Sequence, residues 1–239
     1  MFVHYRTQGI ILKKSDRGEN NRLFTFYTKD FGKLDIAGKA IRKISSKLKS
    51  GTEIFYFSEI EFIQGKRQKI LTDAIVIERF ENIRKDLVKL KLVHRIAEIF
   101  IGLMSGQEKD KKIWSSLLFT FNKINDLQFK ASEIRLWYYY FVWNLFSDLG
   151  YLPELYHCSF CRKKLKPDTL YFSPVEGGII CEQCFPKIKE TKKISTNIVK
   201  ILRILTEKKE KIISKLKIKT TDLKELQLIT EYFLKNHLI

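Results

Sequence analysis

The chain has 239 residues, with 45 Lys and Arg against 27 Asp and Glu, so its formal charge at neutral pH is +18. An excess of this size indicates a polyanionic partner, either nucleic acid or an anionic membrane surface. The longest apolar stretch, Leu136 to Trp143, falls far short of the roughly 20 residues of a transmembrane helix. The first residues also lack the pattern of a secretory signal. We therefore expect a cytoplasmic protein with no membrane partner.

The first 80 residues show the composition of short β-strands separated by turn signals. Five strands are predicted: Thr7 to Lys13, Arg22 to Thr28, Lys33 to Ala40, Thr52 to Ile63 and Lys69 to Glu78. Residues 1–80 also carry 16 basic and 9 acidic side chains, a formal charge of +7. Five short strands with this charge favour an OB-type barrel, a partly open barrel whose face suits oligonucleotides.

From residue 81 the apolar residues recur at helical spacing, which predicts a helical domain over residues 81–239 and an α+β chain overall. One stripe consists of Ile83, Leu87, Leu90, Ala97, Ile101 and Met104, completed by His94 as a core histidine. Three further helices are predicted around Trp114 to Phe121, Ile198 to Leu205 and Leu223 to Phe233. The segment from Ile134 to Leu149 is apolar nearly all round, so we expect it in the centre of a bundle, ended by Gly150.

The four cysteines form two C-x-x-C pairs, Cys158 with Cys161 and Cys181 with Cys184, separated by 19 residues. This spacing is typical of a two-knuckle zinc site, in which each tight turn directs two sulfurs at one ion. Redox-active dithiols and unliganded cysteines are the alternatives. The sequence therefore predicts one structural Zn²⁺ in an insert at about residues 151–190, supported by a short hairpin. A closed four-thiolate site has no open position for catalysis.

A basic segment, residues 38–50, joins the third and fourth predicted strands and contains no acidic residue. Its candidate DNA-binding residues are Lys39, Arg42, Lys43, Lys47 and Lys49. Each can neutralise a phosphate, with Ser45, Ser46 and Gly51 as small neighbours, and none of these contacts would identify a base. The alternative is a solvated charged loop, which the charge of the domain disfavours.

Two further features remain open at this level. The C-terminal run Lys208, Lys209, Lys211, Lys215, Lys217 and Lys219 is either a second contact surface or the solvent face of helices. The strand aromatics Phe24, Phe26, Tyr27, Phe55, Tyr56 and Phe57 either stack on bases or fill the core. The chain lacks the common nucleotide-binding and hydrolase motifs, so we do not expect this protein to be an enzyme.

The order of these features resembles the bacterial DNA repair protein RecO family of recombination mediators. The residues that carry the resemblance are Gly9 to Leu12, Arg22 to Lys33, Gly38 to Arg42, and the cysteine pairs with Gly177 to Ile180. The resemblance implies an N-terminal OB fold and a helical domain interrupted by a zinc finger. Typical members place a basic pair after the glycine turn, where this chain has Arg42 and Lys43.

The resemblance further implies binding of single- and double-stranded DNA, annealing of complementary strands, contact with the single-strand DNA-binding protein, and loading of RecA together with RecR. Because some members lack the cysteines, zinc would be structural. A zinc-ribbon transcription or RNA-associated factor is the alternative function. A metal-dependent nuclease is disfavoured because no carboxylate cluster is visible.

Overall fold

A computed structural model describes residues 3–43, 46–104, 106–107, 109–208 and 210–238. The chain divides into two compact units, residues 1–128 and 129–239. The predicted boundary at residue 80 lies within the first unit, between its barrel and its helices. Among the described residues, the helices are all too short or too polar to cross a bilayer.

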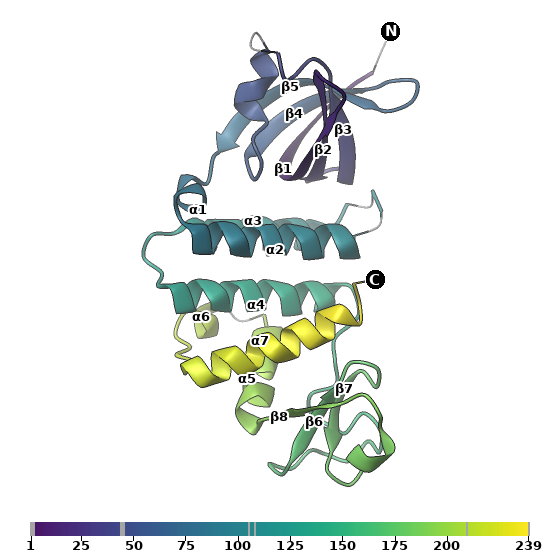
Figure 1. Ribbon diagram of the computed structural model, residues 1–239, viewed down its shortest axis with the longest axis vertical. Helices are drawn as coiled ribbons and strands as arrows, with labels where there is room; N and C mark the ends of the chain where they lie inside the picture. Colours follow the sequence, from purple (N-terminus) through teal and green to yellow (C-terminus); the bar gives the residue numbers. More distant parts are fainter. Residues whose placement is uncertain (1–2, 44–45, 105, 108, 209, 239) are drawn as a thin grey trace. The chain divides into compact units, whose positions relative to one another are not determined.

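The first unit consists of a closed barrel followed by three helices (Figure 1). Its elements are β1 (His4–Arg17), β2 (Asn21–Thr28), β3 (Gly32–Gly38), the 3-10 helix η1 (Lys47–Gly51), β4 (Phe57–Gln64), β5 (Lys69–Glu78), α1 (Glu81–Lys85), α2 (Leu87–Leu103) and α3 (Lys111–Asn125). The strand order around the barrel is β1-β2-β3-β5-β4. The predicted five-stranded barrel is confirmed.

Strand β1 closes the barrel because it is long enough to serve two neighbours. Its first part pairs with β4 and its second part with β2, and the register shifts between Ile11 and Lys13. Such an irregularity bends a strand and increases its twist, as a small barrel requires. The inward side chains form one buried cluster: Ile11, Phe24, Phe26, Leu34, Ile36, Ile41, Ile60, Phe62, Leu71 and Ala74.

The predicted fourth strand is too long at its beginning. The structure has strand only from Phe57, and Phe55 adopts a left-handed conformation with φ of 67°. A bulky residue at positive φ cannot continue a strand. Phe55 instead donates its backbone N–H to the Ile11 carbonyl at 2.8 Å and is 1% exposed. The aromatic run therefore begins as a buried turn, which composition alone does not distinguish from a strand.

The predicted apolar stripe of residues 83–104 is only partly right: Ile83, Ala97 and Met104 are buried as predicted, whereas Leu87 and His94 are not. The Asp86 side chain accepts hydrogen bonds from the backbone of Val88 and Lys89, so a new helix begins there. Leu87 is consequently 73% exposed, and His94 is exposed rather than a core histidine. The buried residues of α2 are Lys89, Val93, Ile96, Ala97, Ile99 and Phe100. The buried Lys89 ammonium donates to the Asp126 carbonyl at 2.7 Å.

The second unit combines three long helices with a small sheet (Figure 1). Its elements are α4 (Ala131–Asp148), β6 (Leu170–Ser173), β7 (Gly178–Cys181), η2 (Phe185–Lys187), β8 (Lys192–Ile194), α5 (Thr196–Thr206), α6 (Glu210–Ile213) and α7 (Thr220–Lys235). The hairpin predicted beside the cysteines is β6–β7, and β8 adds to the free side of β6.

Helix α4 is the buried centre of this unit, as its composition predicts. All residues from Leu136 to Phe146 are buried, and Gly150 follows the helix with φ of 84°. The Trp143 ring stacks on Phe233 of α7 with centroids 4.9 Å apart. The predicted apolar faces of α5 and α7 are likewise buried.

Candidate metal centre and nucleic-acid interface

The two cysteine pairs lie in two tight turns that the small sheet holds together. The first turn is closed by the Arg162 N–H on the Cys158 carbonyl at 2.8 Å, and the second by the Cys184 N–H on the Cys181 carbonyl at 3.1 Å. Cys181 is the last residue of β7. Each turn therefore presents its two sulfurs from a short hydrogen-bonded loop, as the C-x-x-C spacing predicts.

The four sulfur atoms form one group that can hold a metal ion. All four lie within 4.8 Å of one another, and the Cys161 and Cys181 sulfurs are 3.9 Å apart. A tetrahedron with Zn–S bonds of about 2.3 Å has S–S edges of about 3.8 Å. The thiolate set and its dimensions thus fit a tetrahedral metal such as zinc.

The local electrostatics differ between the two buried cysteines. Burial raises the pKa of Cys158, but backbone N–H groups, including those of Cys161 and Cys181, outweigh it and hold that pKa at about 7. Burial and the neighbouring thiols raise the pKa of Cys184 to about 12. A bound cation would favour the thiolate form of all four cysteines, because metal binding displaces thiol protons.

The first turn is joined to the sheet through Gly178. A Cβ at this position would meet the Glu154 carbonyl oxygen at 2.3 Å and the Ser159 hydroxyl at 2.6 Å, so only glycine fits. The Ser159 N–H donates to the Ile179 carbonyl at 2.8 Å, and the Ile179 N–H to the Glu154 carbonyl at 2.9 Å. This close approach fixes the first cysteine pair against β7, which carries the third cysteine.

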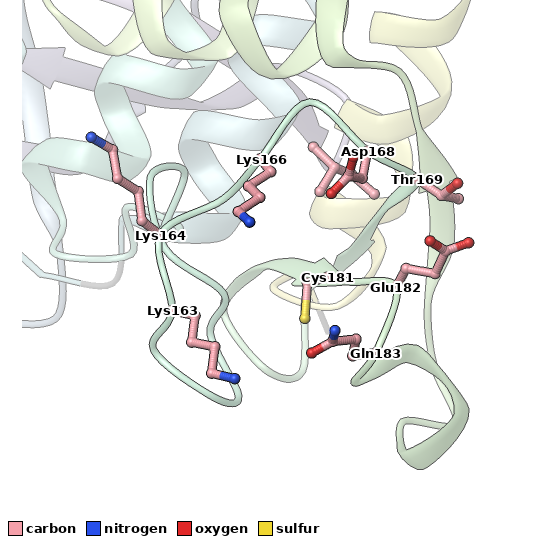
Figure 2. A pocket seen from close by; sticks show the side chains of 9 residues that line it. Lys163, Lys164, Lys166, Asp168, Thr169, Cys181, Glu182 and Gln183 are labelled. Atoms are coloured by element: carbon pink, nitrogen blue, oxygen red, sulfur yellow. The ribbon is translucent and has the colours of Figure 1, made fainter.

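A pocket of about 260 Å³ lies beside the second cysteine turn (Figure 2). Lys163, Lys164 and Lys166 come from the loop along one side of it, and Asp168 and Glu182 lie on the opposite side. The lining charges are therefore mixed. The volume is below that of ordinary ligand sites.

The basic segment between β3 and β4 exposes its cations, although Ile41 is buried in the barrel cluster. Lys39, Arg42, Lys43, Lys47 and Lys49 all have exposed side chains. Ser45, named as one of its small neighbours, lies outside the described residues. The five cations predicted to contact DNA are thus available to solvent, and their assignment to DNA stays a prediction.

Two glycines anchor the basic segment to the barrel. A Cβ at Gly38 would meet the Phe24 ring at 2.8 Å, and a Cβ at Gly51 would meet the Ala74 carbonyl oxygen at 2.0 Å. The Ser58 hydroxyl also donates to the Gly51 carbonyl at 2.9 Å. Both ends of the segment therefore pack directly against the backbone or core of the barrel. This packing fixes the ends of the segment that carries the cations.

Arg42 is partly engaged within the chain. Its guanidinium lies 3.5 Å from the Asp16 carboxylate, whose other oxygen accepts from Arg22 at 2.7 Å. The Arg22 hydrogen bond, followed by the charges of Arg22 and Arg42, lowers the pKa of Asp16. Because this carboxylate is exposed, the pairing costs little to exchange for a phosphate.

A second basic feature, which the sequence reasoning missed, is a groove of about 370 Å³ on the barrel. Its lining residues are Arg17, Asn21, Arg22, Leu23, Ala37, Lys39 and Gln68. Arg17 and Arg22 flank the β1–β2 turn, and Lys39 is the first residue of the basic segment beyond Gly38. The sequence signal that could have predicted this groove is the turn after the first strand. Because Arg17 and Arg22 flank that turn, they lie close together when β1 and β2 pair.

The strand aromatics are buried or half-buried rather than exposed to a ligand. Phe24, Phe26 and Tyr27 are fully buried, while Tyr56 is half-buried with the Arg84 guanidinium 5.2 Å from its ring centroid. Of the two alternatives for these rings, base stacking or core packing, the structure favours core packing. The barrel therefore exposes cations but no aromatic platform among its described residues.

The C-terminal basic run is exposed but not uniform. Lys208 is engaged with Asp148 of the end of α4, and Lys209 lies outside the described residues. Lys211, Lys215, Lys217 and Lys219 are exposed. The alternatives for this run, a contact surface or a solvated face, both remain.

Together these features define a class of protein: an OB-type barrel with an exposed basic segment, followed by helices that carry a four-cysteine metal site. Family comparison specifies the class further. Residues 1–80 match the family described as Recombination protein O N terminal, and residues 84–239 match Recombination protein O C terminal. The chain belongs to the RecO family of DNA repair proteins.

Similar proteins match nearly the whole chain. This chain is 33% identical to the DNA repair protein RecO of Dehalococcoides mccartyi over 224 residues, which cover 94% of this chain and 87% of that protein. It is 30% identical to the DNA repair protein RecO of Roseiflexus sp. over 237 residues, covering 97% and 80%. The Caldanaerobacter subterraneus protein of the same name is 26% identical over 233 residues, covering 98% and 92%.

Proposed function

We propose that this chain is a DNA recombination mediator. It binds single- and double-stranded DNA, anneals complementary strands and, with RecR, helps to load RecA onto DNA covered by the single-strand DNA-binding protein. The observation that carries the proposal is the exposed basic segment, anchored at Gly38 and Gly51 on a barrel of the OB type. Membership of the RecO family supports the same function.

Annealing by this surface needs electrostatics rather than covalent chemistry. Two DNA strands repel each other through their phosphates, and cations that neutralise phosphates lower this repulsion and release counterions. Lys39, Arg42, Lys43, Lys47 and Lys49 supply such contacts, and Arg17 and Arg22 extend them along the barrel groove. Phosphate contacts carry no sequence information, so the activity is independent of sequence and non-enzymatic.

The metal in this proposal is a structural zinc ion held by Cys158, Cys161, Cys181 and Cys184. Four thiolates complete its tetrahedron and leave no position for a reacting water. The ion stabilises the fold of residues 151–190, and the protein acts in the cytoplasm at the nucleoid.

The deciding experiment is a fluorescence annealing assay with complementary strands. The double substitution Arg42→Ala and Lys43→Ala should slow annealing and weaken binding. The log–log slope of single-strand binding against salt should flatten by about 0.7 for each phosphate that the variant no longer neutralises. A matched control is Lys85→Ala with Lys91→Ala, which removes the same charge from exposed positions of α1 and α2.

If the Arg42 and Lys43 variant anneals and binds like the control, the assignment of the basic segment is wrong. A marked preference for a structured RNA over DNA would instead favour an RNA-associated factor. Cleavage of the strands in the same reaction would contradict a non-enzymatic role.

A further inference from the structure

Exposed aromatic rings in this protein gather at the cysteine turns. The chain has 18 Phe, 10 Tyr and 3 Trp, yet across the described ranges the exposed aromatic side chains are Tyr151, Tyr156 and Phe160, at 53%, 50% and 48%. All three lie within ten positions of one another. Burial of aromatic surface is strongly favoured, so an exposed group of rings indicates a site of interaction.

Tyr156 and Phe160 belong to one small hairpin around the first cysteine pair. The Leu165 N–H donates to the Tyr156 carbonyl at 3.0 Å, and His157 pairs with Lys164 in an antiparallel bridge. Phe160 lies in the turn between Cys158 and Cys161. The metal site thus fixes the backbone from which both rings project.

The orientation of the Tyr156 ring is fixed by a cation. The Arg203 guanidinium lies 4.4 Å from the ring centroid and donates from both Nε and Nη2 to the Leu155 carbonyl, at 2.9 Å and 2.5 Å. One face of the ring is therefore covered by a positioned positive charge, while half of the side chain remains exposed. This arrangement prepares the ring for a further planar partner at little entropic cost.

The same hairpin carries a dense group of positive charges. Arg162, Lys163, Lys164 and Lys166 are all exposed, and the ion pairs within the described residues include none of them. Figure 2 shows the three lysines on the loop that borders the pocket. Aromatic rings beside a cationic path are the combination that binds single-stranded nucleic acid.

We propose that the hairpin of residues 156–166 is a base-stacking site for single-stranded nucleic acid. Unpaired bases stack on Tyr156 and Phe160, and the backbone phosphates contact Arg162 and the three lysines. Charge complementarity favours this partner over a protein, because the four cations form no ion pair in the part of the chain that the structure describes. The inference rests on the proposed function and adds what the barrel lacks, a surface that recognises unpaired bases rather than phosphate alone.

The test compares two ligands on the full-length, metal-loaded protein by fluorescence anisotropy. One is an oligothymidine of about 15 nucleotides, within the span of known single-strand sites, and the other is an abasic backbone of equal length. Wild-type protein should prefer the intact oligomer. Phe160→Ala and Tyr156→Ala should each weaken its binding by roughly 5-fold or more, as removal of one stacked base does, and leave abasic binding unchanged.

Three comparisons keep the test specific. Phe160→Leu retains apolar bulk without a π face and should behave like the alanine variant. Val175→Ala, which alters an apolar side chain that is 65% exposed in the same segment, should bind like wild type. The Arg42 and Lys43 variant should weaken binding of both oligomers alike, which separates the barrel contacts from stacking.

Independent evidence comes from photocrosslinking of a bromodeoxyuridine oligomer, mapped by mass spectrometry. Crosslinks at Tyr156 or Phe160 are expected, and their absence from residues 156–166 would overturn the proposal. Alanine variants that retain metal and bind both oligomers like wild type would also overturn it and indicate a protein partner. Failure of the wild type to bind either oligomer would overturn the proposed function as well.

Discussion

The barrel and the cysteine segment, residues 151–190, are stabilised by different means. The barrel has a cluster of ten buried apolar residues. The cluster at the cysteines has three buried members, Cys158, Ile180 and Cys184, two of which are candidate metal ligands. Buried apolar area stabilises by about 25 cal/mol per Å², so the barrel can fold on its own core. The cluster at the cysteine turns is much smaller, so we expect the fold of these turns to depend more on metal–sulfur bonds.

The two regions also differ in the side chains that they expose to solvent. The barrel buries Phe24 and Phe26 in its core and presents cations from an anchored segment. The cysteine turns bury Cys158 and Cys184 but leave Tyr156 and Phe160 exposed. A region held by a few strong bonds can leave apolar side chains outside. The barrel also exposes aliphatic side chains, Ile75 and Ile77 of β5 at 52% and 46%, but no aromatic ring among its described residues.

Removal of the metal should have the largest effect on stability, and this effect should be limited to the cysteine segment. Binding of structural Zn²⁺ is worth on the order of 10 kcal/mol in small zinc domains. We expect Cys181→Ser or chelation to unfold residues 151–190 while the barrel stays folded. Hydrogen exchange should show rapid exchange of β6 and β7 amides and unchanged protection of β1 to β5.

The control for this prediction is Glu182→Gln, an exposed neighbour of Cys181 in the same turn. It should retain one equivalent of zinc by elemental analysis. Protein prepared without chelators that contains no metal would count against the site itself.

Loss of a barrel core ring should have the next largest effect, in the other region. Phe26 is fully buried in the barrel cluster, and removal of a buried phenyl group costs about 3–5 kcal/mol. Phe26→Ala should therefore lower the denaturant midpoint of the barrel while the metal content stays at the wild-type level. Loss of metal in this variant would contradict the independence of the two regions.

Gly51→Ala tests the anchor of the basic segment. The new Cβ would meet the Ala74 carbonyl oxygen at 2.0 Å, so the segment must move away from β5. Overpacking of this kind costs about 1–3 kcal/mol. DNA binding should weaken together with thermal stability. Ser50→Ala, at the exposed adjacent position, should change stability by less than about 0.5 kcal/mol.

The smallest effect is expected at Tyr27, and it depends on pH. Burial, aided by the Asp110 carboxylate, raises the pKa of Tyr27 to about 12, and its hydroxyl has no hydrogen-bond partner among the described residues. An unfolded tyrosine ionises near pH 10, so its contribution to stability is complete below pH 10 and is lost as the pH rises toward 12. Tyr27→Phe should change stability by less than about 1 kcal/mol at pH 7.

The direction of this pH effect is checked by urea unfolding of the Tyr27→Phe variant and of wild type between pH 9 and pH 12, at which the free energy of unfolding is compared. The variant should lose less stability than wild type between pH 10 and pH 12. Parallel losses would show that Tyr27 ionises equally in the folded and unfolded states.

The sequence predicted local patterns well where one physical signal dominates. Four sulfurs at C-x-x-C spacing, the continuous apolar run of α4 and the alternating strands each have one stable arrangement. The predicted stripe of α2 is only partly right because Asp86 restarts the helix with a side-chain cap, a contact that periodicity does not detect. The start of β4 failed because Phe55 occupies a left-handed turn, although its composition is typical of a strand.

The sequence by itself determined the five-stranded barrel before the helices, the four-cysteine group that can hold a metal and the excess of positive charge, because these follow from residue types and short spacings. Only the tertiary structure decided which of the side chains are exposed and which are buried. Strand closure turned Phe24 and Phe26 into the barrel and brought Arg17 and Arg22 beside Lys39. Tyr27 is buried instead by packing on Phe100 of α2 and Trp114 of α3. At the cysteine turns, Cys158 and Cys184 are buried. Tyr156 and Phe160 are left exposed, since so small a hairpin has no interior to receive them.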